Sequence, residues 1–112
     1  MKITHENYDQ LTVVKIQGDL NAELAETLRT LARENLNKTT RDFVLDMTAT
    51  EFIDSQGLET LLWLQEECGQ KLGQVRLAGS TPNVEKILQL TRLSPRFDRH
   101  ADVDAAIKSL RI

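Results

Sequence analysis

An apolar segment followed at once by a helical pattern lies in the middle of the chain, and this pairing limits the possible folds. Residues 43–47 read FVLDM, and such a run is typical of a strand covered on both faces. After it, apolar residues recur at helical spacing, namely Leu58, Leu61, Leu62, Leu64, Cys68 and Leu72. A buried strand that leads into an amphipathic helix is typical of an α/β domain.

Strand and helix patterns also alternate in the first third of the chain. Two strands are expected within residues 2–18, around a turn at residues 8–10. A helix is expected over residues 22–36, because leucine and alanine recur on one face and Asn21 is a suitable N-cap. This part of the chain therefore reads β-β-α.

The last third of the chain continues the alternation. Residues 74–79 read as a strand, Pro82 lies near the start of a third helix, Phe97 falls in a short last strand, and Asp102 caps a fourth helix. The sequence thus predicts an α/β fold in the order β-β-α-β-α-β-α-β-α, with a small mixed sheet and about four helices in one domain, residues 1–112. Helix-to-strand returns imply some parallel pairing, while the strand order stays open.

The turn between the central strand and its helix carries the candidate site. Asp54 and Ser55 are both good N-cap residues, and Gly57 allows a close backbone approach. A hydroxyl at a helix N-terminus lies beside unpaired N–H donors and the positive end of the helix dipole. A phosphate on that hydroxyl would be well placed. The alternative is that Ser55 or Asp54 only caps the helix.

Composition excludes several classes of function. A chain of 112 residues with net charge −3 has no basic patch that predicts direct nucleic-acid binding. No apolar run approaches the roughly 20 residues of a membrane helix, and no signal region opens the chain. Cys68 is the single cysteine and cannot form an internal disulfide, so a cytoplasmic protein without membrane insertion is expected.

The run FIDSQGL at residues 52–58 resembles the F-[IM]-D-S-[ST]-G-L motif of the STAS domain, the fold of the anti-sigma factor antagonists. Weaker matches are GDLN at 18–21, LDMT at 45–48 and LTRL at 90–93. All four occur in the family's order, and the expected element order agrees with that fold. The chain is therefore identified from its motifs as similar to an anti-sigma factor antagonist.

This resemblance implies a switch that does no chemistry itself and needs no cofactor or metal. Ser55 matches the family's phosphorylated serine. The implied partners are an anti-sigma factor that is also a serine kinase of the GHKL type, which binds the unphosphorylated form, and a phosphatase of the PP2C type, which resets it. The expected partner surface around Ser55 comprises Asn21, Asp54, Gln56, Gly57, Glu59 and Trp63.

Departures from the family pattern leave a second function open. Gln56 stands where many members have serine or threonine, Asn21 where many antagonists have aspartate, and Arg92 where glycine is frequent. Some proteins of similar fold are instead non-catalytic subunits of a transporter that dock on its cytoplasmic ATPase. The serine turn would then be a docking surface without phosphorylation.

Other side chains have plain alternatives. A serine hydrolase is disfavoured because no G-x-S-x-G turn occurs and His5 and His100 lie near opposite ends of the chain. Those histidines and Cys68 lack metal-ligand spacing, and Cys68 reads as a buried, inert thiol. Trp63 falls on the polar side of its helix, either as a binding anchor or packed sideways against a neighbouring helix.

Overall fold

The computed structural model describes residues 1–110, which form a five-stranded sheet in the order β1-β2-β3-β4-β5. The strands are β1 (Lys2–Tyr8), β2 (Leu11–Gln17), β3 (Asp42–Ala49), β4 (Val75–Ala78) and β5 (Asp98–His100). The helices are α1 (Ala22–Leu36), α2 (Ser55–Gln70), α3 (Pro82–Leu90) and α4 (Val103–Ser109), with a short 3-10 helix, η1 (Ser94–Arg96).

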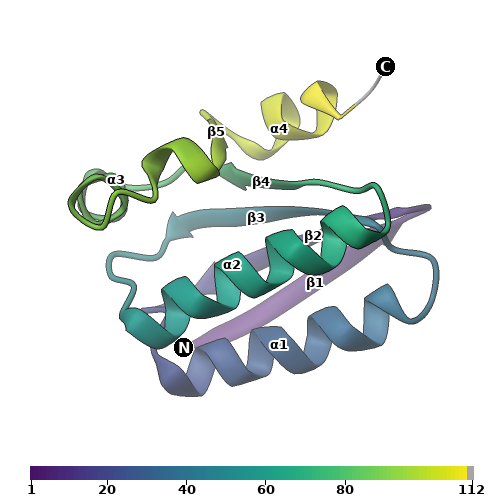
Figure 1. Cartoon of the computed structure of the whole chain (residues 1–112), viewed down its shortest axis with the longest axis horizontal. Helices are drawn as coiled ribbons and strands as arrows, with labels where there is room; N and C mark the ends of the chain where they lie inside the picture. Colours follow the sequence, from purple (N-terminus) through teal and green to yellow (C-terminus); the bar gives the residue numbers. More distant parts are fainter. Residues whose placement is uncertain (111–112) are drawn as a thin grey trace.

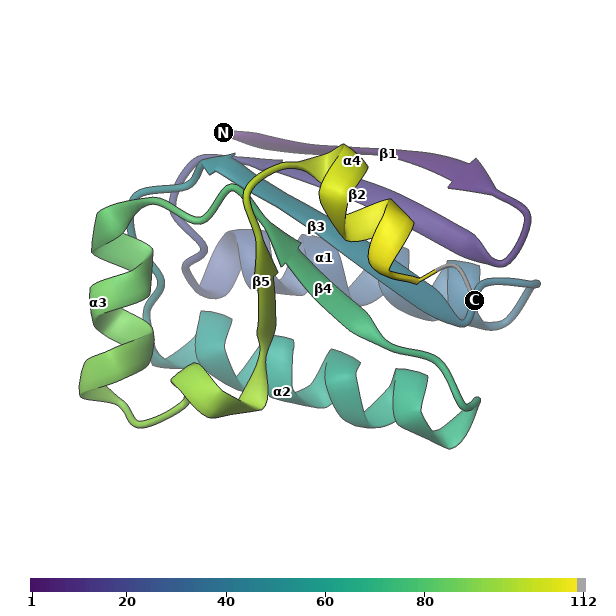
Figure 2. The same cartoon turned by 90° about the horizontal axis from the view of Figure 1, so that it is seen from above.

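The strand order explains the layers. β1 and β2 pair antiparallel, whereas β2, β3, β4 and β5 are parallel, so each crossover from β2 onward steps in the same direction. Because such crossovers share one hand, α1 and α2 cover the same face of the sheet (Figure 1). α4 follows the last strand and lies on the opposite face, while α3 lies at one end (Figure 2).

The main core lies between the sheet and the α1–α2 layer. Alternate residues of β3 point into it, and Phe43, Leu45 and Met47 are fully buried there. Val44 points to the other face, where it packs with Ala78 and Ala106 under α4. A strand covered on both faces was expected for residues 43–47 and is confirmed, because apolar side chains on both sides leave no face for water.

The expected element order and the mixed sheet are confirmed. Asn21 and Asp102 cap α1 and α4 as expected, and each side chain accepts a backbone N–H three residues on. At the start of α2, Asp54 is the cap and Ser55 is the first helical residue. The two-residue turn at Asp9 and Gln10 also joins β1 to β2 as expected.

One expectation about α2 is wrong. Leu72 does not join the apolar stripe, because the helix ends at Gln70 and Leu72 lies beyond it, with φ of 62° and an 88% exposed side chain. In the same helix, the polar residue Thr60 is buried. Its hydroxyl hydrogen is satisfied by the Gln56 carbonyl oxygen at 2.9 Å, and its oxygen accepts from Arg29 of α1 at 2.9 Å. A threonine satisfied in this way can face a neighbouring helix.

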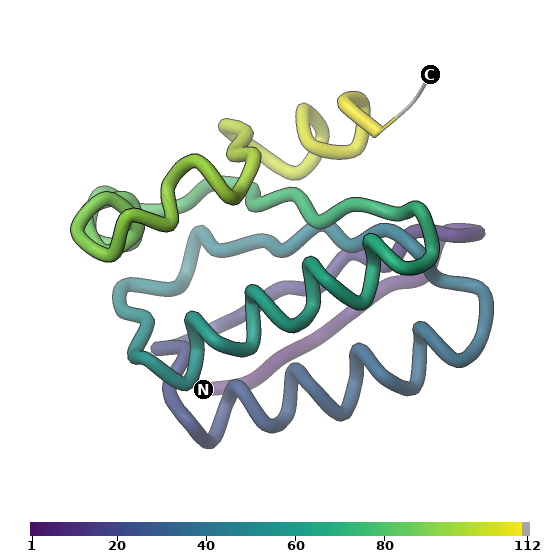
Figure 3. Tube along the Cα trace, viewed as in Figure 1, coloured from purple at the N-terminus to yellow at the C-terminus, as the bar shows by residue number. Residues whose placement is uncertain are grey.

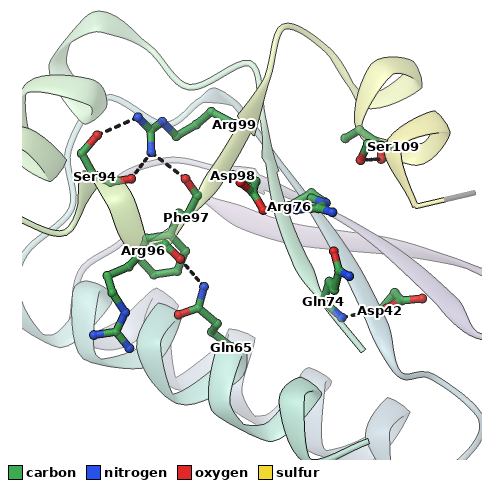
Figure 4. A network of polar contacts seen from close by, with 11 residues as sticks. Asp42, Gln65, Gln74, Arg76, Ser94, Arg96, Phe97, Asp98, Arg99 and Ser109 are labelled. Atoms are coloured by element: carbon green, nitrogen blue, oxygen red, sulfur yellow. Dashed lines mark hydrogen bonds and ion pairs between the residues drawn. The ribbon is translucent and has the colours of Figure 1, made fainter. Parts of the chain in front are cut away.

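Arginine and amide side chains fasten the end of the sheet near β5 (Figure 4). Arg99 donates to the Ser94 hydroxyl and to the Phe97 carbonyl oxygen, both at 2.7 Å. Gln65 of α2 donates to the carbonyl oxygen of Arg96. These bonds tie η1 and β5 to α2, so the short last strand is held by side chains as well as by its backbone ladder.

A membrane-spanning helix is absent from residues 1–110, since none of the helices there has the necessary length and apolar character.

Candidate functional site

Three loops meet where parallel strands β2, β3 and β4 end. The loop after β2 and the loop after β3 are joined by backbone bonds, because Leu20 N donates to Phe52 O at 2.9 Å and Asp54 N donates to Leu20 O at 3.2 Å. Leu20 and Ile53 form an isolated parallel bridge at the same place. The chain path in Figure 3 shows the second loop turning directly into α2. The start of α2 is therefore fixed by the backbone.

Polar side chains fix the third loop to the second. The buried Thr50 donates its hydroxyl to Ile16 O at 2.9 Å, and its own carbonyl oxygen accepts from the Thr81 hydroxyl at 3.0 Å. Asn83, at the start of α3, donates to the Glu51 carboxylate at 3.1 Å. The loops after β2, β3 and β4 thus form one continuous, hydrogen-bonded edge.

Gly57 lets α2 begin so close to the β2–α1 loop. A Cβ atom at this position would lie 2.3 Å from the Leu20 carbonyl oxygen and 2.7 Å from Cγ2 of Ile53. No side chain fits at such distances. Gly57 is buried and supports the site by close packing, while its place in the expected partner surface stays a prediction.

The Ser55 hydroxyl is presented to solvent. Asp54 caps α2 by accepting the Gly57 N–H at 2.9 Å, which places Ser55 at the first helical position. Ser55 and Gln56 are both exposed. The N–H groups of these first helical positions have no partner within the helix. An oxyanion attached to the Ser55 oxygen would therefore lie next to free donors and the positive end of a 16-residue helix.

The surroundings of Ser55 are acidic and partly apolar. Glu51 and Glu59 are exposed, and the carboxylate of Asp54 is half-buried. Phe52 lies three residues before Ser55 and is 51% exposed, although its backbone is held to Leu20. A large aromatic ring that is exposed on a fixed backbone can contact a partner without a large loss of conformational freedom.

Asn21 belongs to the same edge through α1. Its side chain accepts the Leu24 N–H at 3.0 Å, and the residue is half-buried. The bridge between Leu20 and Ile53 brings the starts of α1 and α2 together. Of the residues expected around Ser55, the structure thus gathers Asn21, Asp54 and Gln56 at one edge, with Glu59 one turn further along α2.

Trp63 lies apart from this edge, in the seam between α1 and α2. The ring is half-buried, and the guanidinium carbons of Arg29 and Arg33 lie 5.3 Å and 5.2 Å from its centroid. Of the two interpretations of this tryptophan, sideways packing against a neighbouring helix fits the structure. A role of the half-buried ring as a binding anchor stays a prediction.

Sequence reasoning missed Phe52 and the Glu51–Asn83 bond. Phe52 belongs to the recognised run but was not included in the expected partner surface, and the structure shows that it is 51% exposed. Glu51 and Asn83 are 32 positions apart. No local pattern indicates a bond of that kind.

The histidines and the cysteine are, by residue type, candidates for catalysis or metal binding. His5 lies in β1 and His100 in β5, the two edge strands of the sheet. Across residues 1–110 no group of three or more His, Cys, Asp or Glu side chains is arranged to hold a metal ion. Burial raises the pKa of the Cys68 thiol to about 12, which keeps the thiol protonated.

Comparisons with known proteins agree with the motif. A family model described as the STAS domain matches residues 2–106. BtrV of Bordetella bronchiseptica, a relative named as an anti-sigma factor antagonist, is 28% identical over 91 residues, covering 81% of this chain and 78% of BtrV. A STAS-domain containing protein of Pseudomonas aeruginosa is 31% identical over 88 residues, covering 79% of this chain and 86% of that protein.

Solved structures share the fold at lower identity. A protein of Thermotoga maritima, described as an anti-sigma factor antagonist, superposes with a TM-score of 0.90 at 22% identity, over 98% of this chain and 95% of that chain. The antagonist SpoIIAA in its unphosphorylated form gives 0.83 at 19% identity, over 96% of both chains. The murine anion transporter Slc26a9 gives 0.73 at 16% identity over 94% of this chain, which corresponds to 18% of the transporter.

Proposed function

This chain belongs to the STAS domain family, and from that premise we propose that it is a protein-interaction module switched by phosphorylation of Ser55. The observation that carries the proposal is the exposed Ser55 hydroxyl at the first position of α2, inside the FIDSQGL run. The unphosphorylated form binds an anti-sigma factor that is also a serine kinase of the GHKL type, and a sigma factor is thereby released. A phosphatase of the PP2C type reverses the modification.

Charge is the proposed means of switching. A phosphoserine adds about −1.5 to −2 charges at neutral pH. Glu51 and Glu59 already make this surface acidic. Glu51 lies in a loop that is hydrogen-bonded to its neighbours, and Glu59 lies in α2. The added charge would repel an acidic partner surface, or the phosphate would prevent a close contact between that surface and Ser55. Neither effect requires the domain to refold.

The proposed contact surface combines the edge residues with one aromatic side chain. Asn21, Asp54, Ser55, Gln56 and Glu59 supply its polar part. Phe52 supplies a large apolar contact next to Ser55, since aromatic side chains are enriched among the residues that contribute most to binding.

The protein itself would carry out no reaction, and residues 1–112 would act as one domain. Phosphoryl transfer would be catalysed by the kinase, which binds ATP, and removal of the phosphate by the phosphatase. Because the proposed kinase uses cellular ATP, the proposal also assigns the switch to the cytoplasm.

Phosphopeptide mapping of the protein isolated from its native cell tests the modification. Phosphate should be found on Ser55, and the corresponding peptide of Ser55→Ala should carry none. Partner binding is tested with Ser55→Ala and Ser55→Asp baits, whose captured proteins are compared by mass spectrometry. A GHKL-type kinase enriched on Ser55→Ala and depleted on Ser55→Asp would support the switch. Equal capture by both baits would contradict it.

A second candidate function rests on the likeness to a transporter. The match to Slc26a9 shows that this fold occurs within an anion transporter, and the second candidate is a non-catalytic STAS subunit that docks a cytoplasmic ATPase of a transporter. In that case the same baits should capture a transporter ATPase, capture should not depend on the charge at Ser55, and no phosphate should be found there.

A further inference from the structure

β1 is an edge strand whose outer side is open. It is the first strand in the sheet order, it has seven residues, and all of them except the half-buried Ile3 are exposed. The strand contains no proline and pairs with β2 without a register shift. Proteins commonly protect a free edge by a proline, a bulge or a covering element. The β1 edge has no such protection within residues 1–110.

The hairpin register identifies the backbone groups on this edge. Tyr8 and Leu11 flank a two-residue turn and form a hydrogen-bonded pair. Since hydrogen-bonded and non-hydrogen-bonded pairs alternate along an antiparallel ladder, Ile3, His5 and Asn7 direct their N–H and C=O groups away from β2. Three residues therefore offer a regular row of donors and acceptors to an added strand.

α1 adds charge beside this edge. The helix runs next to β1 (Figure 1), and an open groove of about 830 Å³ separates the two. Glu23, Glu26 and Glu34 of α1 line the groove over a half-buried Leu31, and Lys38 lies among the lining residues at the C-terminal side of the helix. The helical side of the edge is therefore predominantly acidic.

The spacing of the glutamates suits an extended chain. Glu23 and Glu34 are separated by a helical rise of roughly 16 Å. Side chains on one face of a strand are spaced about 7 Å apart, so three of them span about 14 Å. A strand added to β1 would place alternate side chains over the α1 glutamates, while its backbone paired with Ile3, His5 and Asn7.

We propose that the free edge of β1 binds an extended, basic segment of a partner protein by strand addition. Backbone bonds supply the alignment, and the α1 glutamates select lysine or arginine at alternate positions. A second copy of this chain fits less well, because pairing of two β1 edges about a two-fold axis brings the acidic sides of two α1 helices together.

Synthetic peptides test the proposal with the intact protein. The probe is an acetylated and amidated peptide that alternates threonine and lysine over seven residues. Two matched peptides carry glutamate in place of lysine, or N-methyl groups on the alternate amides that would face β1. In 50 mM salt, the lysine peptide should shift the amide resonances of Ile3, His5 and Asn7. The glutamate and N-methylated peptides should bind at least tenfold more weakly.

Variants separate the strand from the charge. His5→Pro removes one outward N–H and should weaken the lysine peptide at least tenfold, as should the double change Glu26→Lys and Glu34→Lys. Glu66→Lys, on the exposed side of α2, is the matched charge control and should bind nearly as wild type does. Equal binding of the N-methylated peptide, shifts confined to other surfaces, or a dimer that His5→Pro dissociates would overturn the proposal.

Discussion

The absence of a side chain at Gly57 allows the start of α2 to pack closely on the β2–α1 loop. The space that a Cβ atom of residue 57 would need is occupied by the Leu20 carbonyl oxygen and the Ile53 side chain. By contrast, a Cβ atom at Gly69 of the same helix would have no neighbour within 4 Å. The two glycines therefore have different physical roles, one in close packing and one without a packing requirement.

We expect Gly57→Ala to lower the free energy of unfolding by about 1–3 kcal/mol, because the added group forces two backbone segments apart. Gly69→Ala should raise it by roughly 0.5–1 kcal/mol, because alanine reduces the backbone entropy lost in a helix. Urea unfolding followed by circular dichroism measures both. Equal stability of Gly57→Ala and wild type would show that the loops adjust to the added methyl group without cost.

Cys68 should be unreactive in the folded protein. Its side chain is fully buried, and desolvation is the main cause that raises its pKa from 9.0 to about 12. Since the thiolate is the reactive form, iodoacetamide at pH 8 should label the protein only as fast as it unfolds. Addition of urea should restore rapid labelling.

The same raised pKa predicts a loss of stability in alkali. Below pH 9 the thiol is protonated in both the folded and the unfolded state, so the stability is fully present. As pH rises from 9 toward 12, only the unfolded chain ionises, and stability falls. Cys68→Ala should lack this contribution, so its decline over that pH range should be shallower than that of wild type. If the stabilities of the two proteins fall in parallel over this pH range, the contribution of Cys68 is refuted.

At the scale of elements, side chains of α1 and α2 meet around Trp63. The ring lies against Arg29 and Arg33, and Arg29 also donates to the buried Thr60. Two cations over one ring stabilise the contact by electrostatic attraction as well as by packing. This seam holds the two helices together on one face of the sheet.

Trp63→Ala should therefore act on stability. A cost of about 2–3 kcal/mol is expected, less than for a fully buried tryptophan because the ring is only half-buried. Phe52→Ala is the matched control on the exposed edge and should change stability by less than about 0.5 kcal/mol. Thermal unfolding of both variants decides the matter. A Trp63→Ala protein as stable as wild type would place the ring outside the packed seam.

The ends of α2 and α3 show a second feature of elements. Leu72 and Arg92 each follow a helix with φ of 62°, the left-handed conformation that favours glycine. After α2, Gly73 N donates to Cys68 O at 2.7 Å, as in a Schellman motif. Arg92 stands where glycine is frequent in the family, and its positive φ leaves the end of α3 formed but strained.

Leu72→Gly should raise the free energy of unfolding by about 1 kcal/mol, because glycine adopts this conformation without steric cost. Little is lost with the leucine side chain, which is 88% exposed. Leu90→Gly, at an exposed helical position, should instead lower stability by roughly 0.5 kcal/mol. If both changes destabilise the protein alike in urea unfolding, strain at Leu72 is refuted.

At the scale of the whole molecule, the site lies at the end of the sheet where the parallel strands β2, β3 and β4 finish. α1, α2 and α3 all begin at this end, so their positive ends lie near one another. The loops between them are joined by hydrogen bonds, and the core lies behind them. Such an edge can change its charge without changing its shape.

Phosphorylation of Ser55 should accordingly leave the fold unchanged. We expect the phosphoprotein to be as stable as the unmodified protein or more stable by up to about 1 kcal/mol, because a negative group at a helix N-terminus is favourable. Changes in amide resonances should be confined to residues 18–21, 50–59 and 79–83. Widespread changes across β1 to β5 would show that the modification refolds the domain.

Local signals in the sequence were sufficient for the element order, the caps and the serine turn. The apolar run of β3, the leucine spacing of α1 and the capping residues Asn21 and Asp102 each depend on residues within a few positions of one another. Such local patterns predict helices, strands and their ends without knowledge of the tertiary structure. The phosphorylation and the partner surface, in contrast, stay predictions.

Contacts between distant parts of the chain were decided by the tertiary structure alone. The strand order is one example. Three others are the contact of Thr60 with Arg29, the backbone bond that holds the exposed Phe52 to Leu20, and the contact of Gly57 with Leu20, which join residues about 30 to 40 positions apart. No local period specifies such a contact, because it depends on which helix lies against which strand once the sheet is assembled. Trp63 is the clearest case, since the sequence left open whether its ring packs against a neighbouring helix, and the structure places Arg29 and Arg33 of α1 over it.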